Sequence, residues 1–206
     1  MSTNFGAAAD DYRRFRAGFP DSFFDRLAAL GIGGAGITVV DVGTGTGAFV
    51  REFVRRGARA IGIDPDDRML NQARQIDRAD GLSIEYKVGR AEQIPLPDAY
   101  ADLVSAGQCW HWFDGPKAAG EFARVAKPSG RDLESFSYDV DVPYTPEAWR
   151  GRIRASVGVG ASLEPEEVRA FDAAHERLLA EAFSGEVLHA PHRIFAVLGV
   201  RSNTRA

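Results

Sequence analysis

The chain has 206 residues, of which 45% are hydrophobic and 26% charged, with a formal net charge of −4 at pH 7. This composition is typical of a globular domain and excludes a disordered or fibrous chain. The acidic balance argues against partners that are nucleic acid or anionic membrane. The single cysteine, Cys109, excludes an internal disulfide, and no apolar run approaches the ~20 residues of a membrane-spanning helix. We therefore expect a cytoplasmic protein.

Helix and strand patterns alternate along the first part of the chain. The expected elements, in order, are a helix from Pro20, a strand at Thr38–Val42, a helix at 48–56, a strand at 59–63, a helix after Asp64-Pro65, strands at 83–88 and 101–105, and a helix at 116–126. Strands that alternate with helices predict a parallel sheet with right-handed crossovers.

After Gly130 this alternation stops. The expected elements are then a strand at 131–142, a helix at 146–157, a longer helix at 164–183 capped by Ser162, and a last strand at 194–200. No internal repeat, low-complexity tract or interdomain linker interrupts the chain.

The most informative stretch is the end of the first strand. An apolar, β-branched run reaches Asp41, and Gly43, Gly45 and Gly47 follow at alternate positions before an amphipathic helix. Glycines of this kind bring backbone close to a ligand that a Cβ would exclude, and loop amides bind carboxylates. Asp64 ends the next strand about 20 residues later, where such folds bind ribose hydroxyls. These residues predict a nucleotide-type cofactor.

Four stretches, in this order and spacing, resemble class I S-adenosylmethionine-dependent methyltransferases. The resemblance is to the small-molecule group that includes ubiquinone-biosynthesis and trans-aconitate methyltransferases. The stretches are 41–47 (Asp-Val-Gly-Thr-Gly-Thr-Gly), 62–70, 89–98 with the strand that follows, and 121–130 with its Lys-Pro-Ser-Gly turn. Together they cover about residues 36 to 130.

The resemblance implies the fold. It implies an α/β three-layer sandwich with a Rossmann-like, mostly parallel sheet and an antiparallel final strand. A single methyltransferase domain over residues 1–206 is then expected, with N-terminal cap helices in 1–35, a cofactor-binding half in 36–130 and a substrate-side half in 131–206.

The resemblance also implies S-adenosylmethionine as the cofactor. The residues expected to bind it are Asp41, Gly43, Thr44, Gly45, Gly47, Asp64, Pro65, Met69, Ala91, Glu92, Gln108, Tyr12 and Arg16. Asp64 would accept hydrogen bonds from both ribose hydroxyls, because a carboxylate matches a cis-diol. The alternatives are that Asp64 is a helix N-terminal acid, Met69 a core residue and Glu92 a solvated side chain.

The loop after the fourth predicted strand is expected to line the active site, because ligands of open α/β sheets bind beyond the carboxyl ends of strands. His111 in this loop is the candidate general base. Trp110 and Trp112 are expected on the substrate side, since aromatic faces tolerate a sulfonium cation. They could instead pack the sheet edge. The four histidines and one cysteine have no metal-ligand spacing, so we expect no metal.

A second substrate-side group is expected in the helix at 146–157. Trp149 and Arg150 lie in the region that caps the substrate pocket in the resembled group, where an arginine could pair with a substrate carboxylate. The alternative is a charged surface helix.

The resemblance breaks at one junction. In the family the Lys-Pro-Gly-Gly-like turn leads into a fifth parallel strand, whereas here Gly130 runs directly into Arg131 and a stretch similar to the family's sixth strand. We expect that roughly 40 to 50 residues of a strand–helix crossover are missing between Gly130 and Arg131. The alternative is that no residues are missing and that the stretch after Gly130 is a strand with a changed role.

The predicted function is methyl transfer from S-adenosylmethionine to a small-molecule acceptor by a monomer or homodimer. One alternative is an NAD(P)-dependent oxidoreductase, because Gly43-x-Gly45-x-x-Ala48 also fits the looser dinucleotide-binding pattern. The other is a non-catalytic S-adenosylmethionine-binding protein, which the missing strand would favour.

Overall fold

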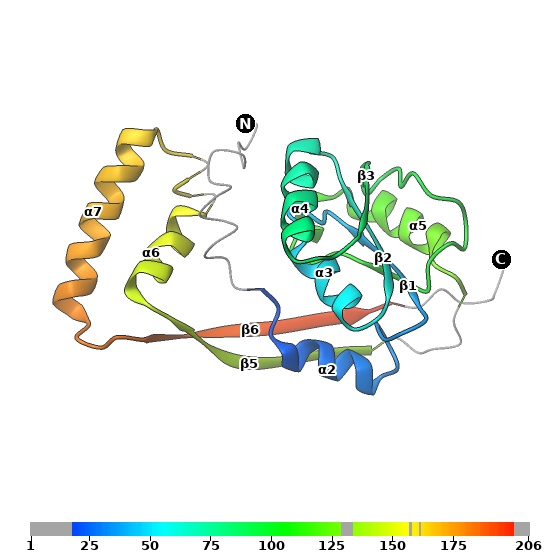
Figure 1. Cartoon of the computed structure of the whole chain (residues 1–206), viewed down its shortest axis with the longest axis horizontal. Coiled ribbons are helices and arrows are strands. Elements are labelled where there is room, and N and C mark those ends of the chain that lie inside the picture. Colours follow the sequence, from blue (N-terminus) through cyan, green and yellow to red (C-terminus); the bar gives the residue numbers. More distant parts are fainter. Residues whose placement is uncertain (1–17, 129–133, 157, 161, 200–206) are drawn as a thin grey trace. The chain divides into compact units, whose positions relative to one another are not determined.

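The computed structural model describes residues 18–128, 134–156, 158–160 and 162–199. They form two compact units, one of the described residues between 18 and 135 together with 197–199, and one of the described residues between 136 and 196 (Figure 1). Each unit is described by itself. The predicted contacts of Tyr12 and Arg16 and the Gly130–Arg131 junction lie outside the described residues.

The first unit contains a four-stranded parallel sheet in the order β3–β2–β1–β4. Its strands are β1 (Thr38–Val42), β2 (Arg59–Asp64), β3 (Glu85–Val88) and β4 (Leu103–Ser105). The four predicted strands are confirmed. The last one is shorter than predicted, because Ala101 forms an isolated bridge to Ala126 instead. Among the described residues β4 is the edge of this sheet, so its outer side has no strand neighbour.

Helices cover both faces of the sheet. They are α3 (Ala48–Arg55), α4 (Asp67–Ala79) and α5 (Gly115–Val125). Val40 and Ile61 point to one face, where they pack with Ala118 and Val125 of α5. Side chains alternate along a strand, and α3 and α4 contact the opposite face (Figure 1). The predicted three-layer α/β sandwich is confirmed in this unit.

A cluster of phenylalanines attaches the short helix α2 (Asp21–Ala29) to α3. The rings of Phe19 and Phe49 lie 4.3 Å apart, and those of Phe24 and Phe53 lie 5.4 Å apart. Phe24 and Phe53 are almost fully buried, so this contact adds a second apolar cluster on the α3 side of the sheet.

The second unit consists of two strands and two helices. These are β5 (Glu134–Tyr144), α6 (Pro146–Arg154), α7 (Pro165–Ala182) and β6 (Leu188–Leu198). The two strands form an antiparallel pair of their own. The predicted antiparallel final strand is therefore present, and among the described residues its neighbour is β5 rather than a strand of the parallel sheet.

The start of α7 differs from the prediction. Its N-cap is Glu164 and not Ser162, and the Glu167 carboxylate accepts a hydrogen bond of 3.0 Å from the Glu164 backbone N–H. Pro165 explains the shift, because proline is favoured at the first helical position. No helix among the described residues is long and apolar enough to cross a membrane.

Candidate functional site

The glycine loop between β1 and α3 is built from left-handed backbone. Gly43, Gly45 and Gly47 have φ angles of 71°, 57° and 80°, a region that favours glycine. A Cβ on Gly43 would lie 2.6 Å from Cys109 Sγ, and one on Gly47 would overlap the Tyr86 hydroxyl. These two glycines therefore leave room for side chains of the protein itself.

Gly45 has different surroundings. A Cβ at this position would meet only the Met69 methyl group, at an ordinary 3.6 Å. The Gly45 backbone N–H donates to Asp64 Oδ2 over 2.9 Å. The structure thus brings together Gly45, Asp64 and Met69, three of the residues predicted to bind the cofactor.

Two backbone hydrogen bonds fix the Asp64 carboxylate at the end of β2. Oδ2 accepts from Gly45 and Oδ1 accepts from the Asp66 N–H at 2.9 Å. Each oxygen keeps a lone pair, so the carboxylate can still accept two hydroxyl groups. Burial raises the pKa of Asp64, and the two backbone bonds oppose that shift. Asp66, not Asp64, caps α4, because its side chain accepts from Arg68 N–H.

Asp41 lies under the loop and is only 1% exposed. Ser105 Oγ donates to its Oδ1 over 2.8 Å. Burial raises the pKa of Asp41 to about 7, while the hydroxyls of Thr44 and Ser105 act to lower it and the charge of Asp64 adds to the rise. Sequence reasoning gave Ser105 no role. Its role depends on the pairing of Asp41 with Ser105 across β1 and β4, which the structure shows and the sequence does not.

The loop after β4 packs onto the glycine loop. Cys109 Sγ–H donates to the Val42 carbonyl over 3.2 Å. Gln108 has a φ of 61°, which is uncommon for a residue with a side chain and is found at functional sites. The short 3₁₀ helix η2 (Trp110–Trp112) follows.

The tryptophans of η2 are exposed. Trp110 is 45% and Trp112 is 56% exposed. The Trp110 ring packs against Phe113 and Phe122 at 5.8 and 5.5 Å, so part of its surface serves packing. His111 is exposed, and its ring lies 4.9 Å from that of Trp112. Exposed aromatic surface of this kind is typical of a ligand or partner contact.

Comparisons with known proteins agree with this geometry. Residues 40–132 match the model of a methyltransferase domain family. An uncharacterised methyltransferase of Mycobacterium tuberculosis is 37% identical over 131 residues, which are 64% of this chain and 51% of that protein. A malonyl-[acyl-carrier protein] O-methyltransferase of Serratia marcescens is 33% identical over 156 residues, 75% of this chain and 59% of that protein.

Residues 40–132 form a class I S-adenosylmethionine-dependent methyltransferase domain. The solved structure of the YcgJ protein of Bacillus subtilis shares the fold, with a TM-score of 0.60 and 17% identity over 90% of this chain and all of that one. The chain spans between half and three fifths of the length of the two curated relatives described above.

The cofactor of this family is S-adenosylmethionine, and the methyltransferase domain has residues that fit it. The Asp64 carboxylate is fixed and keeps acceptor sites for a diol. Gly45 beside it offers backbone without a Cβ, and the Met69 side chain lies next to that opening. Among the described residues, no group of His, Cys, Asp and Glu side chains is placed to hold a metal ion.

The predicted adenine-side residues follow β3. Ala91 is 4% exposed and belongs to the apolar cluster beneath β1 and β2. Glu92 Oε1 accepts from the Asp114 N–H over 2.9 Å, and this bond lowers the pKa of Glu92. The Glu92 side chain therefore holds the start of α5. Pro65 is exposed directly after Asp64. The cofactor roles of these residues stay predictions.

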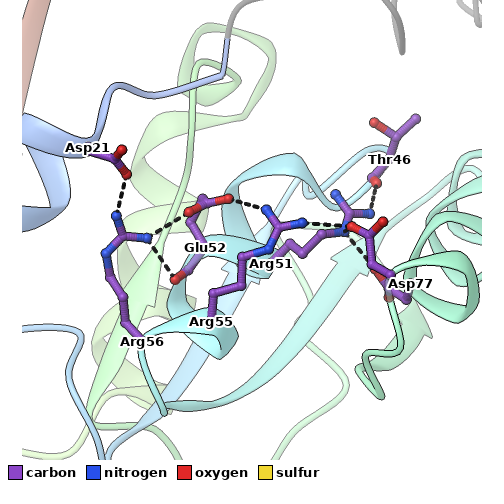
Figure 2. Close-up of polar contacts among 8 residues, drawn as sticks. Asp21, Thr46, Arg51, Glu52, Arg55, Arg56 and Asp77 are labelled. Atoms are coloured by element: carbon purple, nitrogen blue, oxygen red, sulfur yellow. Dashed lines mark hydrogen bonds and ion pairs between the residues drawn. The ribbon is translucent and has the colours of Figure 1, made fainter.

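A buried ion pair supports the glycine loop of the methyltransferase domain from below. Arg51 of α3 donates from Nε to Asp77 Oδ1 of α4 over 2.8 Å and from Nη2 to the Thr46 carbonyl over 2.9 Å (Figure 2). Arg51 and Asp77 are 5% and 3% exposed. Sequence reasoning missed this pair, because each residue alone is indistinguishable from a charged residue on the solvent face of a helix.

The remaining substrate-side residues lie on α6 of the second unit. The Trp149 ring is 5.3 Å from that of Tyr144. Arg150 donates from Nε to Asp172 Oδ1 over 3.1 Å and also pairs with Glu176, so two carboxylates of α7 neutralise its charge. This arrangement fits the alternative of a charged helix surface. The substrate role of Arg150 stays a prediction.

Proposed function

We propose that the chain transfers a methyl group from S-adenosylmethionine to a small-molecule acceptor. The observation that carries this proposal is the Asp64 carboxylate, held by the backbone of Gly45 and Asp66 beside the glycine loop of a methyltransferase domain. Asp64 binds the ribose hydroxyls, and Asp41 favours the positively charged amino group of the methionyl part. Met69 lies against the adenine, and Ala91 with Glu92 binds its edge.

When bound, the cofactor supplies a methyl group on a positively charged sulfur, which is already activated for transfer. The task of the chain is therefore alignment of the acceptor with that methyl group. We assign this task to Gln108, Trp110 and Trp112. His111 removes a proton only if the attacking group has a high pKa, since a carboxylate acceptor needs no base. Tyr12 and Arg16 close over the methionyl end.

The name of the Serratia relative supports a small acyl-type acceptor, since that protein is a malonyl-[acyl-carrier protein] O-methyltransferase. We further propose that residues 1–206 act as one methyltransferase domain, in a cytoplasmic protein that is a monomer or a homodimer. We propose that it binds neither nucleic acid nor a membrane. Trp149 belongs to the acceptor side.

Calorimetric titration with S-adenosylhomocysteine tests the proposal, with NAD as the control ligand. We expect a micromolar Kd, about −8 kcal/mol, and no binding of NAD. Asp64→Ala is expected to lose roughly 1.5–3 kcal/mol of that affinity, because it removes hydrogen bonds to a charged acceptor.

Asp67→Ala is the matched control, since Asp67 is an exposed carboxylate three residues away at the start of α4. Its affinity should equal that of the wild type. An unchanged affinity in Asp64→Ala would remove Asp64 from the site. Binding of NAD alone would make the chain an oxidoreductase. The absence of binding of both ligands would contradict the proposal.

A further inference from the structure

The three arginines of α6 fall into two groups. Arg150 and Arg154, four residues apart, both donate to Asp172 of α7 and hold the pKa of that carboxyl below its usual range. Arg152 lies on a different part of the helix surface and is half-buried. Over the described ranges no carboxylate is paired with Arg152, so its charge lacks a counter-ion there.

Arg152 lies near Tyr144 and His192, since its charge acts on the pKa of both side chains. Tyr144 ends β5, is 5% exposed and has its ring 5.9 Å from that of His192 on β6. The Tyr144 hydroxyl is buried, and no described residue accepts a hydrogen bond from it, because the neighbouring Arg152 guanidinium can only donate. A buried donor without an acceptor is rare in native proteins and calls for an explanation such as a bound ligand.

The protonation of this cluster favours an anion. Burial raises the pKa of Tyr144, and the charge and the hydrogen bond of the nearby Arg152 oppose the rise without cancelling it, so the hydroxyl remains a donor at neutral pH. Burial and the Arg152 charge lower the pKa of His192, which keeps the imidazole neutral. The cluster thus carries one positive charge, and its guanidinium and hydroxyl both need an acceptor.

A carboxylate fits these donors best. A guanidinium fork binds both carboxylate oxygens at once, and a hydroxyl adds a third hydrogen bond. Trp149 lies three residues before Arg152, on the same side of α6, and its ring packs against Tyr144. The apolar ring supplies a wall for the body of a small molecule.

We propose that Arg152, Tyr144 and His192 form a carboxylate-binding site within the second unit, which stands independently of the proposed methyl transfer. The arginine that binds the carboxylate is Arg152 and not Arg150, because Arg150 is already paired with Asp172 and Glu176.

The test is a calorimetric titration of the full chain with succinate, in the presence of saturating S-adenosylhomocysteine. We expect saturable binding in the millimolar range or tighter. Arg152→Gln should weaken it at least tenfold, and Arg152→Lys should give an intermediate loss, since it keeps the charge but loses the planar fork. Tyr144→Phe, which removes only the hydroxyl, should weaken binding several-fold.

Arg169→Gln is the matched control, because Arg169 is an exposed arginine on α7 of the same unit. It removes the same charge and should leave succinate binding unchanged. Melting curves of each variant establish that the fold is retained, and Tyr144→Phe keeps the test valid if Arg152→Gln does not fold.

Three results would overturn the proposal. They are the absence of saturable binding up to about 10 mM succinate, equal affinity in the wild type and Arg152→Gln, and tighter binding of phosphate than of succinate. The titration with S-adenosylhomocysteine separates this proposal from the first one. Binding of succinate without binding of S-adenosylhomocysteine would support this site and contradict the methyl-transfer proposal. Binding of S-adenosylhomocysteine without binding of succinate would support methyl transfer and contradict this site.

Discussion

The buried Asp41, beneath the glycine loop, makes the free energy of unfolding depend on pH. Its pKa is about 7 in the folded chain and 3.8 when exposed, because burial penalises the charged form. Between these values the unfolded chain is ionised at this residue and the folded chain is not. The contribution of Asp41 to the free energy of unfolding is therefore fully present below about pH 3.8 and is lost as the pH rises through about 7.

We therefore predict that the free energy of unfolding contains a contribution from Asp41 that falls by roughly 2–3 kcal/mol between pH 5 and pH 8, at about 1.36 kcal/mol per pKa unit. Asp41→Asn removes this contribution. Urea denaturation of both proteins at the two pH values measures the difference, so other titrating groups cancel. Equal pH dependence in the two proteins would contradict the assigned pKa. Asp98→Asn, an exposed carboxyl, is the control.

The roles of single residues were predictable where a short pattern carries them. The Asp64–Gly45 contact follows from a strand-end acid and a glycine loop, both visible in the sequence. Arg152 was not predictable in this way. Three arginines at alternate positions look equivalent in the sequence, and only the structure shows that two of them pair with α7. A buried hydroxyl without an acceptor is likewise visible only in the structure.

At the scale of elements, the Arg51–Asp77 pair joins α3, α4 and the glycine loop across 26 residues of sequence. We predict that Arg51→Ala lowers the free energy of unfolding by about 3–5 kcal/mol, because it leaves the Asp77 carboxyl buried without its partner. Urea denaturation measures this loss.

Arg55→Ala on the same helix is the control. The Arg55 side chain is 45% exposed and pairs with Glu52 (Figure 2). It also pairs with Asp80. Exposed pairs of this kind contribute about 1 kcal/mol or less. A loss in Arg51→Ala no larger than that in Arg55→Ala would show that the buried pair does not anchor the loop.

Elements with a strong local pattern were predicted well. The strands β1 and β2 are apolar runs buried on both faces, and the first helix of the domain begins directly after Gly47, as predicted. The partner of β6 was not predictable, because alternation in a strand specifies which side chains share a face and says nothing about the neighbouring strand. The prediction of Ser162 as the N-cap of α7 was wrong, because Pro165 is favoured at the first helical position and makes Glu164 the N-cap.

At the scale of the whole molecule, the two proposals use chemically different groups, one in each unit. In the first proposal the Asp64 carboxylate accepts hydroxyl groups, and in the second the Arg152 guanidinium binds an anion. A nucleoside cofactor and a carboxylate therefore do not compete for the same groups. Because different groups bind the two ligands, each ligand can be tested in the presence of the other.

We predict that the two ligands protect different amides from hydrogen exchange in the full chain. S-adenosylhomocysteine should slow exchange in residues 43–47, 64–70 and 91–92, and succinate should slow it around Tyr144 and His192. At a ligand concentration of about 100 times Kd, the bound state gains about 2.7 kcal/mol, which slows amides that exchange by opening of the whole unit up to about 100-fold.

Mass-spectrometric exchange on the wild type, Asp64→Ala and Arg152→Gln measures this protection. Asp64→Ala should lose only the protection from S-adenosylhomocysteine, because Arg152 and its neighbours are unchanged. Arg152→Gln should lose only the protection from succinate. Protection by S-adenosylhomocysteine confined to residues 136–196 would place the cofactor away from Gly45 and Asp64, and the glycine loop would then be a structural turn that serves the packing of Cys109 and Tyr86.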